Sequence, residues 1–118
     1  MSARPTLQLP GLTVEVAIGF WQRLVGLLGR RNLDEGKGLL LTRCNNIHTA
    51  FMRFPIDAVF IDNEGAILAI RDRMGAFRIA VAPRSKACLE LRSGAAARHG
   101  LQVGQILTPL LPALRGQR

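Results

Sequence analysis

The sequence predicts an α+β fold that is mostly β: a curled antiparallel sheet, barrel-like or sandwich-like, of about six to eight short strands. One amphipathic helix near the N-terminus and a short late helix complete the prediction. Three observations support it. Short apolar segments follow one another with tight connections, a single early stretch repeats apolar residues at helical spacing, and strands and helices do not alternate as in doubly wound folds.

The first predicted elements are a strand and the early helix. Residues 12–18 (LTVEVAI) alternate apolar and polar side chains, which is typical of a half-buried strand. Over residues 20–30 the apolar residues recur at helical spacing, and Arg23 lies off their stripe. Two glycines then indicate a loop over residues 34–38.

From residue 38 the chain becomes rich in strands. Residues 39–42 and 47–54 are strand-like, although Pro55 interrupts the second run. The clearest signal is AVFIDNEGAILAIRD, residues 58–72, in which two apolar runs flank an Asp-Asn-Glu-Gly turn. Turn residues of this kind accept positive φ angles, so this segment predicts a β-hairpin.

The last third of the chain adds strands and the late helix. The segments FRIAVA and ACLELR are two more strand candidates. The segment SGAAARHG fits one or two helical turns, with Ser93 as the N-cap. QVGQILTPLL is interpreted as a glycine turn and a last strand, and residues 110–118 as a frayed tail.

The composition indicates one globular domain, residues 1–118, because 48% of the residues are hydrophobic and 20% are charged. No apolar run reaches the ~18 residues that a membrane-spanning helix needs, so we expect no membrane span. The chain has no apolar signal core before Pro10, so we expect a cytoplasmic protein. In that reducing compartment Cys44 and Cys88 are expected to be free thiols rather than a disulfide.

The formal net charge of +8 at pH 7 comes almost entirely from arginine, since only Lys37 and Lys86 are lysines. The arginines are spread along the chain, and no alternation of basic and aromatic residues indicates a base-stacking platform. We therefore expect no specific nucleic-acid partner. Any contact with polyanions should be weak, sequence-blind and sensitive to salt.

Five segments occur in a distinctive order: FWQRLVGLLGRR, GKGLLL, IHTAFMRFPIDAVFIDNEGAIL, ACLELRSG and GLQVGQIL. Over about residues 16–107 this order resembles the family known as domain of unknown function 192. The resemblance implies a compact, mostly β single domain and carries over no reaction. The cysteine and histidine before the central motif are not obligatory in that family, so the resemblance does not imply a family-wide metal site.

Cys44, His48 and Met52 lie four residues apart at the start of the central motif. Thiolate, imidazole and thioether are the soft ligands that copper(I) prefers. On one strand, however, residues four apart are separated by about 13 Å, which is too far for a shared ion. We therefore expect no metal and no cofactor, and these three residues are the only metal candidates.

A candidate binding pocket involves the polar residues of the same motif. Its rim would consist of His48, Thr49, Arg53, Asp57 and Arg23. Arg53 would anchor an anion, and Arg23 on the early helix would either reach a carboxylate on the sheet or face water. Asp57 has a second interpretation as a structural tether. A carboxylate at the head of a buried strand must be satisfied, and backbone N–H groups, Thr49 or Arg53 could hold it.

Two functions fit these residues. The first is a non-catalytic ligand-binding or partner-binding accessory domain with a polar site around residues 46–57, taking a small anionic ligand or a protein partner. The alternative is a small hydrolase-like or metal-dependent enzyme that uses His48, Asp57 and a cysteine, with Cys44 or Cys88 as nucleophile. An enzyme should bring two titratable groups together in a buried cavity, whereas a binding domain should show a wider recess or an exposed patch.

Overall fold

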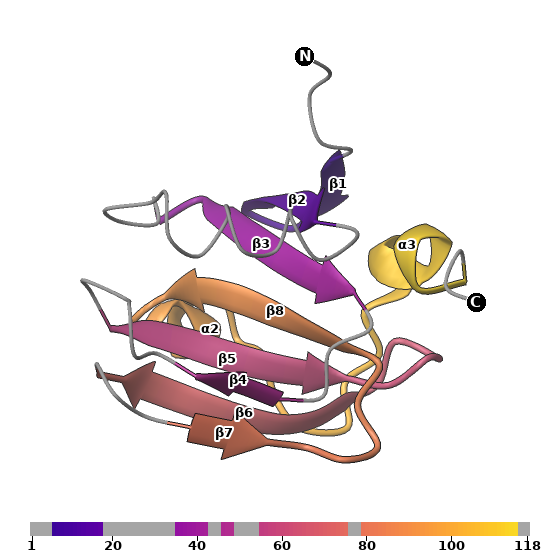
Figure 1. Cartoon of the computed structure of the whole chain (residues 1–118). Coiled ribbons are helices and arrows are strands. Elements are labelled where there is room, and N and C mark those ends of the chain that lie inside the picture. Colours follow the sequence, from indigo (N-terminus) through magenta and orange to yellow (C-terminus); the bar gives the residue numbers. More distant parts are fainter. Residues whose placement is uncertain (1–5, 18–34, 43–45, 49–54, 76–78, 116–118) are drawn as a thin grey trace.

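The computed structural model describes residues 6–17, 35–42, 46–48, 55–75 and 79–115, and Figure 1 shows their arrangement. The strands are β1 (Thr6–Leu9), β2 (Leu12–Ala17), β3 (Lys37–Thr42), β4 (Asn46–His48), β5 (Ile56–Ile61), β6 (Ile67–Met74), β7 (Ile79–Val81) and β8 (Ala87–Arg92). The helical segments are α2 (Ala95–Arg98), the 3-10 helix η1 (Thr108–Leu110) and α3 (Leu111–Arg115). The mostly β fold is confirmed, whereas the early helix predicted over 20–30 lies outside the described residues. No helix in the described ranges is long and apolar enough to cross a membrane.

Six strands form one sheet in the order β1-β2-β3-β8-β5-β6, and β4 pairs with β7 in a second sheet. Within the described residues the larger sheet is open, because its end strands β1 and β6 do not pair, so the barrel-like alternative is wrong. The prediction of an antiparallel sheet holds for the other pairs of this sheet but not for β2 and β3, which are parallel. Parallel neighbours need a crossover connection of about a dozen residues or more, and residues 18–36 provide that length.

The predicted hairpin is confirmed as β5 and β6. Its turn is held by Asp62, whose Oδ1 accepts hydrogen bonds from the backbone N–H groups of Glu64 and Ala66, both at 2.9 Å. Gly65 has a φ of 87°, a value that strains any residue with a side chain. The Asp-Asn-Glu-Gly sequence therefore forms this turn through a side-chain acceptor and a glycine in the left-handed region.

Strand β1 was missed by the sequence prediction. It forms a hairpin with β2 in which Leu9 lies opposite Leu12. Between them, Pro10 and Gly11 occupy the central positions of the turn, and Gly11 has a φ of 77°. A type II turn favours proline followed by a residue with positive φ. The Pro-Gly pair after the alternating sequence TLQL was therefore the available signal.

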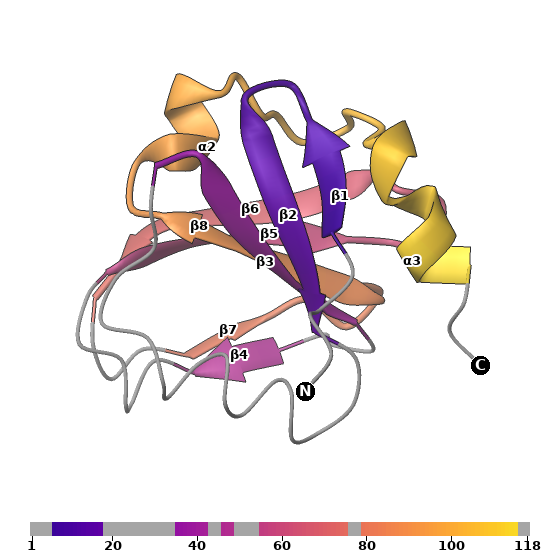
Figure 2. The ribbon, with the colours of Figure 1, turned by 90° about the horizontal axis from the view of Figure 1, so that it is seen from above.

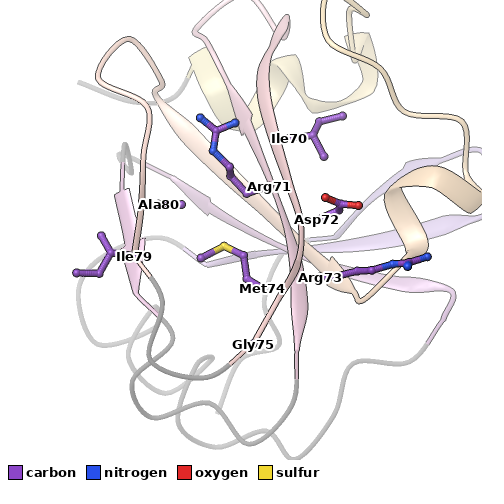
Figure 3. Close-up of a pocket in the computed structure, with 8 residues that line it drawn as sticks. All are labelled: Ile70, Arg71, Asp72, Arg73, Met74, Gly75, Ile79 and Ala80. Atoms are coloured by element: carbon purple, nitrogen blue, oxygen red, sulfur yellow. The ribbon is translucent and has the colours of Figure 1, made fainter.

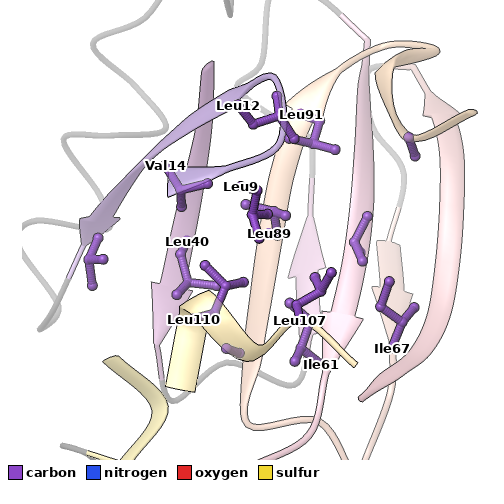
Figure 4. Close-up of a cluster of buried hydrophobic side chains, with 14 of the residues drawn as sticks. Leu9, Leu12, Val14, Leu40, Ile61, Ile67, Leu89, Leu91, Leu107 and Leu110 are labelled. Atoms are coloured by element: carbon purple, nitrogen blue, oxygen red, sulfur yellow. The ribbon is translucent and has the colours of Figure 1, made fainter. Parts of the chain in front are cut away.

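Buried apolar side chains form two clusters, one on each face of the larger sheet. The first includes Leu40 and Leu89 of the sheet and Leu110 of η1, and Figure 4 shows part of it. The second includes Phe60 of β5 and Ala80 of β7. In Figure 2, α2 and α3 lie over one face of the sheet and β4 and β7 over the other. The sheet is therefore the central layer of the fold.

The strand predicted within residues 102–111 does not form. Residues 102–107 contribute only an isolated bridge between Ala66 and Ile106. The chain then continues into η1 and α3, with Pro109 and Pro112 in their first turns. Proline is tolerated there because the first N–H groups of a helix have no partner inside that helix.

The prediction of a frayed tail is wrong for residues 110–115. Leu110 and Leu114 are buried in the first cluster, one on each of the two consecutive helical segments. Burying a leucine side chain contributes roughly 1.5–3 kcal/mol. This contribution offsets the low intrinsic stability of such short helices, so the C-terminal segment is held by packing.

Candidate functional site

Asp57, the carboxylate of the central motif, is fully buried in β5. Its Oδ1 accepts hydrogen bonds from the backbone N–H groups of Arg73 at 2.8 Å and Gly94 at 2.9 Å. Its Oδ2 accepts one from the N–H of Ala96 at 2.8 Å. A carboxylate removed from water needs such donors, because they replace the hydration that it loses. Asp57 therefore joins β5 to two other segments through backbone groups.

The contact with Arg73 belongs to a β-bulge in β6. The pairing of β5 and β6 shifts between Ile56 and Ala58, so that one extra residue of β6 is accommodated opposite Asp57. Arg73 has a φ of 53°, in the left-handed region that residues with side chains rarely adopt. The bulge takes the N–H of Arg73 out of the regular ladder, and the carboxylate of Asp57 supplies its acceptor.

The other two contacts cap α2. The late helical turn is confirmed, but its N-cap is Gly94 rather than the predicted Ser93. Gly94 has a φ of 86° and no side chain that could accept the first N–H groups of the helix. Asp57 takes this role from β5, because it accepts the N–H groups of Gly94 and Ala96.

A recess of about 640 Å³ opens beside the bulge, between the second half of β6 and β7. Figure 3 shows its lining residues, which are Ile70, Arg71, Asp72, Arg73, Met74, Gly75, Ile79 and Ala80. Met74 and Ala80 are buried on its inner side, whereas Ile79 is 76% exposed. Because the lining contains two arginines and one aspartate, the recess has a net positive charge.

The bulge determines where the two arginines of the recess lie. In Figure 3, Arg71 and Met74 are on the side of β6 that faces β7, whereas Asp72 and Arg73 are on the opposite side. Regular alternation would place Arg71 and Arg73 on the same side of the strand. The extra residue moves Arg73 across, so the two guanidinium groups flank β6.

The recess adjoins the central motif. His48 lies opposite Ile79 in the pairing of β4 with β7. Ile56 lies opposite Met74 in the pairing of β5 with β6. Both Ile79 and Met74 line the recess. The first and last parts of the predicted polar site, residues 46–48 and 55–57, are therefore next to the recess.

Only part of the predicted pocket is placed. The predicted binding and metal residues outside the described ranges are Arg23, Cys44, Thr49, Met52 and Arg53. His48 is placed through its backbone in β4, and Asp57 through its backbone and side chain. In the described part of the chain, no group of three or more His, Cys, Asp or Glu side chains could hold a metal ion.

Strand β8 carries two further polar groups on the face of the second cluster. Cys88, the alternative nucleophile, is a fully buried thiol. Glu90 is 1% exposed and lies between Leu39 of β3 and Ala58 of β5 in the sheet. Both side chains are inside the protein and neither lines the recess.

A second polar cluster, which the sequence prediction missed, joins α2 to the chain before β3. Arg98 donates hydrogen bonds from Nε to Oε2 of Glu35 at 2.7 Å and from Nη2 to Oε1 at 2.5 Å. His99 Nε2 lies 3.5 Å from Oε2 of the same glutamate. The hydrogen bonds from Arg98 lower the pKa of Glu35, and the same contact raises the pKa of Arg98. Bidentate pairing of this kind fixes the relative orientation of the two side chains.

The arginines of the recess were also missed as site residues. Arg71 and Arg73 lie at the end of the predicted hairpin, where three charged residues follow one another. Such a run interrupts the alternation of a half-buried strand, and charges and bulges are both common on edge strands. The interrupted alternation was therefore the signal that could have identified this surface.

Comparison with known proteins extends these observations. The model of the family DUF192, described as "Uncharacterized ACR, COG1430", matches residues 4–109. A solved structure from Sinorhizobium meliloti 1021, provisionally called a transcription regulator, has a TM-score of 0.74 and 25% identity, covering 90% of this chain and 95% of that one. A protein of unknown function from Novosphingobium aromaticivorans DSM 12444 has a TM-score of 0.72 and 20% identity, covering 86% and 80%. The chain matches none of the curated proteins.

Proposed function

Since the chain belongs to the DUF192 family, whose description names no reaction, we propose that it is a non-catalytic binding domain whose recess between β6 and β7 takes an anionic ligand or partner. The positive charge of the recess carries this proposal. Arg71 lies on the side of β6 that faces β7, whereas Asp72 and Arg73 lie on the other side of the strand and oppose each other in charge. The guanidinium fork suits carboxylate and phosphate groups. The buried side chains of Met74 and Ala80 add an apolar inner surface.

The polar site around residues 46–57 is the second part of the proposed surface. The backbone pairing of His48 with Ile79 brings β4 to the recess, which supports a contribution from the motif. We assign His48, Thr49, Arg53 and Arg23 as candidate contacts of the same ligand. Asp57 supports the surface indirectly, because it holds the bulge that separates Arg71 from Arg73.

The contacts of Asp57 favour binding over the enzymatic alternative. A general base must reach the proton that it removes from a substrate. The carboxylate of Asp57 is fully buried and already accepts three backbone hydrogen bonds. The thiol of Cys88 is likewise fully buried. Neither group therefore presents the exposed, available atom that the enzymatic alternative needs.

Titration of the ¹⁵N-labelled protein with citrate at constant ionic strength tests the binding function. We expect the largest amide shift changes within residues 71–75 and at Ile79 and Ala80. Arg71→Gln and Arg73→Gln should each weaken the response. Arg115→Gln on α3 is the matched control, because α3 packs on the first cluster and Arg115 does not line the recess. Shift changes spread evenly over the surface, or equal weakening by the control, would contradict the proposal.

Duplex DNA forms a second arm of the same experiment, because the similar protein from Sinorhizobium meliloti is provisionally called a transcription regulator. For this chain we expect sequence-blind binding that fades between about 50 and 200 mM salt, as the release of counterions requires. If one DNA sequence stays bound at the higher salt concentration, the ligand is nucleic acid rather than the proposed small anion or acidic partner.

A further inference from the structure

Building on the proposed binding function, we infer that the occupant of the recess is an extended acidic peptide of a partner protein, which pairs with the outer edge of β6. β6 is the longest described strand and ends the order of the larger sheet. An edge strand presents backbone N–H and C=O groups on its outer side, and an extended peptide can pair with them as an added strand. The recess lies along this edge.

The first part of the β6 edge is already occupied by the chain itself. The N–H of Ile67 donates to the C=O of Gln105, and the N–H of Gly104 donates to the C=O of Ile67, both at 2.9 Å. The bridge between Ala66 and Ile106 continues this contact. An added strand is therefore restricted to the second half of β6, where the recess opens.

The ladder indicates which backbone groups of that second half point outward. The C=O of Ile61 accepts a hydrogen bond from the β8 side, so by alternation the backbone groups of Phe60 turn toward β6, where Ala69 lies opposite. Ile70 and Asp72 then direct their N–H and C=O groups away from β5. Within the described ranges these outward groups have no hydrogen-bond partner.

The side chains of this edge select for an acidic strand. Arg71 and Arg73 flank β6 on its two sides, so carboxylates on either face of an added strand would meet a guanidinium group. A second copy of β6 would instead bring like charges together, which opposes pairing between two identical edges. Ile79 is 76% exposed at the recess and offers a contact for an apolar side chain of the peptide.

The bulge limits the length of the added strand. The N–H of Arg73 turns inward to Asp57, so regular pairing stops at that residue. With the start of β6 covered by residues 104–106, the open edge is short. Such a site should hold a few residues of a partner, with affinity that depends on both backbone pairing and charge.

Fluorescence anisotropy with a labelled Glu-Glu-Val-Glu-Glu-Val peptide, which carries carboxylates on both faces of an added strand, tests the inference. The same peptide N-methylated at every backbone amide keeps its charges but cannot pair as a strand on either edge, and Lys-Lys-Val-Lys-Lys-Val keeps the pairing but reverses the charge. We expect binding of the first peptide only, with slowed exchange of the amide protons of Ile70 and Asp72. Arg71→Gln and Arg73→Gln should each weaken it about two- to five-fold, and Arg115→Gln should not.

The possible failures can be told apart. If citrate shifts the recess amides but the N-methylated peptide binds as well as its parent, strand pairing is overturned while anion binding stands. If neither citrate nor the acidic peptide affects the recess, both proposals fall. Sedimentation velocity tests a third possibility, that a second copy of this chain occupies the edge. A dimer that blocks peptide binding and that persists in Arg71→Gln would overturn the acidic partner.

Discussion

At the scale of single residues, Asp57 shows how one side chain can satisfy three distant backbone donors. An ionised carboxylate has about four acceptor positions, and three are used by N–H groups at 2.8–2.9 Å. Hydrogen bonds to a charged acceptor are roughly twice as strong as neutral ones. The bulge of β6 and the start of α2 therefore depend on the same carboxylate.

Replacing Asp57 with alanine should destabilise the protein strongly. Each stranded buried donor costs about 1–3 kcal/mol, so the loss of one acceptor for three donors should lower the free energy of unfolding by about 3–5 kcal/mol. Urea denaturation followed by circular dichroism measures this change. The free energy of unfolding of Asp57→Asn should lie between those of the parent protein and Asp57→Ala, because the asparagine amide keeps one acceptor oxygen.

Asp62→Ala is the matched control for this experiment. Oδ1 of Asp62 also accepts two backbone N–H groups, but in a turn that contacts water. Water can replace the lost acceptor there, so the expected cost is only about 1 kcal/mol. Equal effects of the two substitutions, or an Asp57→Ala protein as stable as the parent, would refute the tether.

The sequence predicted only part of the role of Asp57. Its place directly before an apolar run predicts that its carboxylate must be satisfied, and backbone N–H groups were among the expected partners. The identity of the donors could not be predicted, because they lie 16, 37 and 39 residues away. The left-handed conformation of Arg73 was equally hidden, since arginine has no preference for it.

At the scale of elements, local patterns predicted the strands better than their pairing. The hairpin of β5 and β6 could be predicted because its turn and its alternation are contiguous. The parallel pair β2 and β3 was missed, although a strand, a predicted helix and a second strand in succession favour parallel neighbours. The false last strand arose because a short apolar run does not by itself indicate a strand: Val103 and Ile106 are 64% and 51% exposed in the segment that precedes η1.

The pair of Glu35 and Arg98 ties α2 to the segment before β3, and its strength should depend on pH. Arg98 lowers the pKa of Glu35 from the ordinary value of 4.5. Because the folded-state pKa is the lower one, the stabilisation is present above the unfolded-state pKa and is lost as pH falls through the folded-state pKa. Titration of the Glu35 carboxyl ¹³C signal should give a midpoint below 4.5.

Arg98→Gln tests the cause of that shift. The variant removes the guanidinium group, so the midpoint of Glu35 should move back toward its ordinary value. Arg115→Gln changes the net charge equally but does not contact Glu35, and should leave the midpoint where it was. Both side chains of the pair are about half exposed, so little change in overall stability should accompany the shift. An unchanged midpoint in Arg98→Gln would show that another group lowers the pKa.

At the scale of the whole molecule, the sheet separates two apolar clusters, and burial on both faces explains the continuous apolar run of residues 58–61 in β5. A mostly β domain could be predicted from such segments. The sheet order β1-β2-β3-β8-β5-β6 could not, because it places β8 between β3 and β5 through contacts distant in sequence. The recess was unpredictable for the same reason, since it forms between β6 and a strand of the other sheet.

The burial of Cys88 makes its thiol a probe of the whole fold. It is fully buried between β3 and β5 in the second cluster, so iodoacetamide should reach it only when the sheet opens. Mass spectrometry should find Cys88 unlabelled in native buffer, fully labelled in denaturant, and not crosslinked to Cys44. Labelling should be faster in Asp57→Ala than in Asp62→Ala. Rapid labelling of the native parent protein would contradict the position of Cys88 in the core.

The hydrogen bonds of Asp57 also restrict the order in which the chain can assemble. Its carboxylate has all three donors only after β5, β6 and the residues entering α2 have met. Before that point, enclosing the charge in apolar surroundings is unfavourable by several kcal/mol. Pairing β5 with β8 brings the N–H groups of Gly94 and Ala96 close, whereas the hairpin of β5 and β6 brings only that of Arg73. Neither pairing alone supplies all three donors, so Asp57 should lose its water only when β5 has both β6 and β8 beside it.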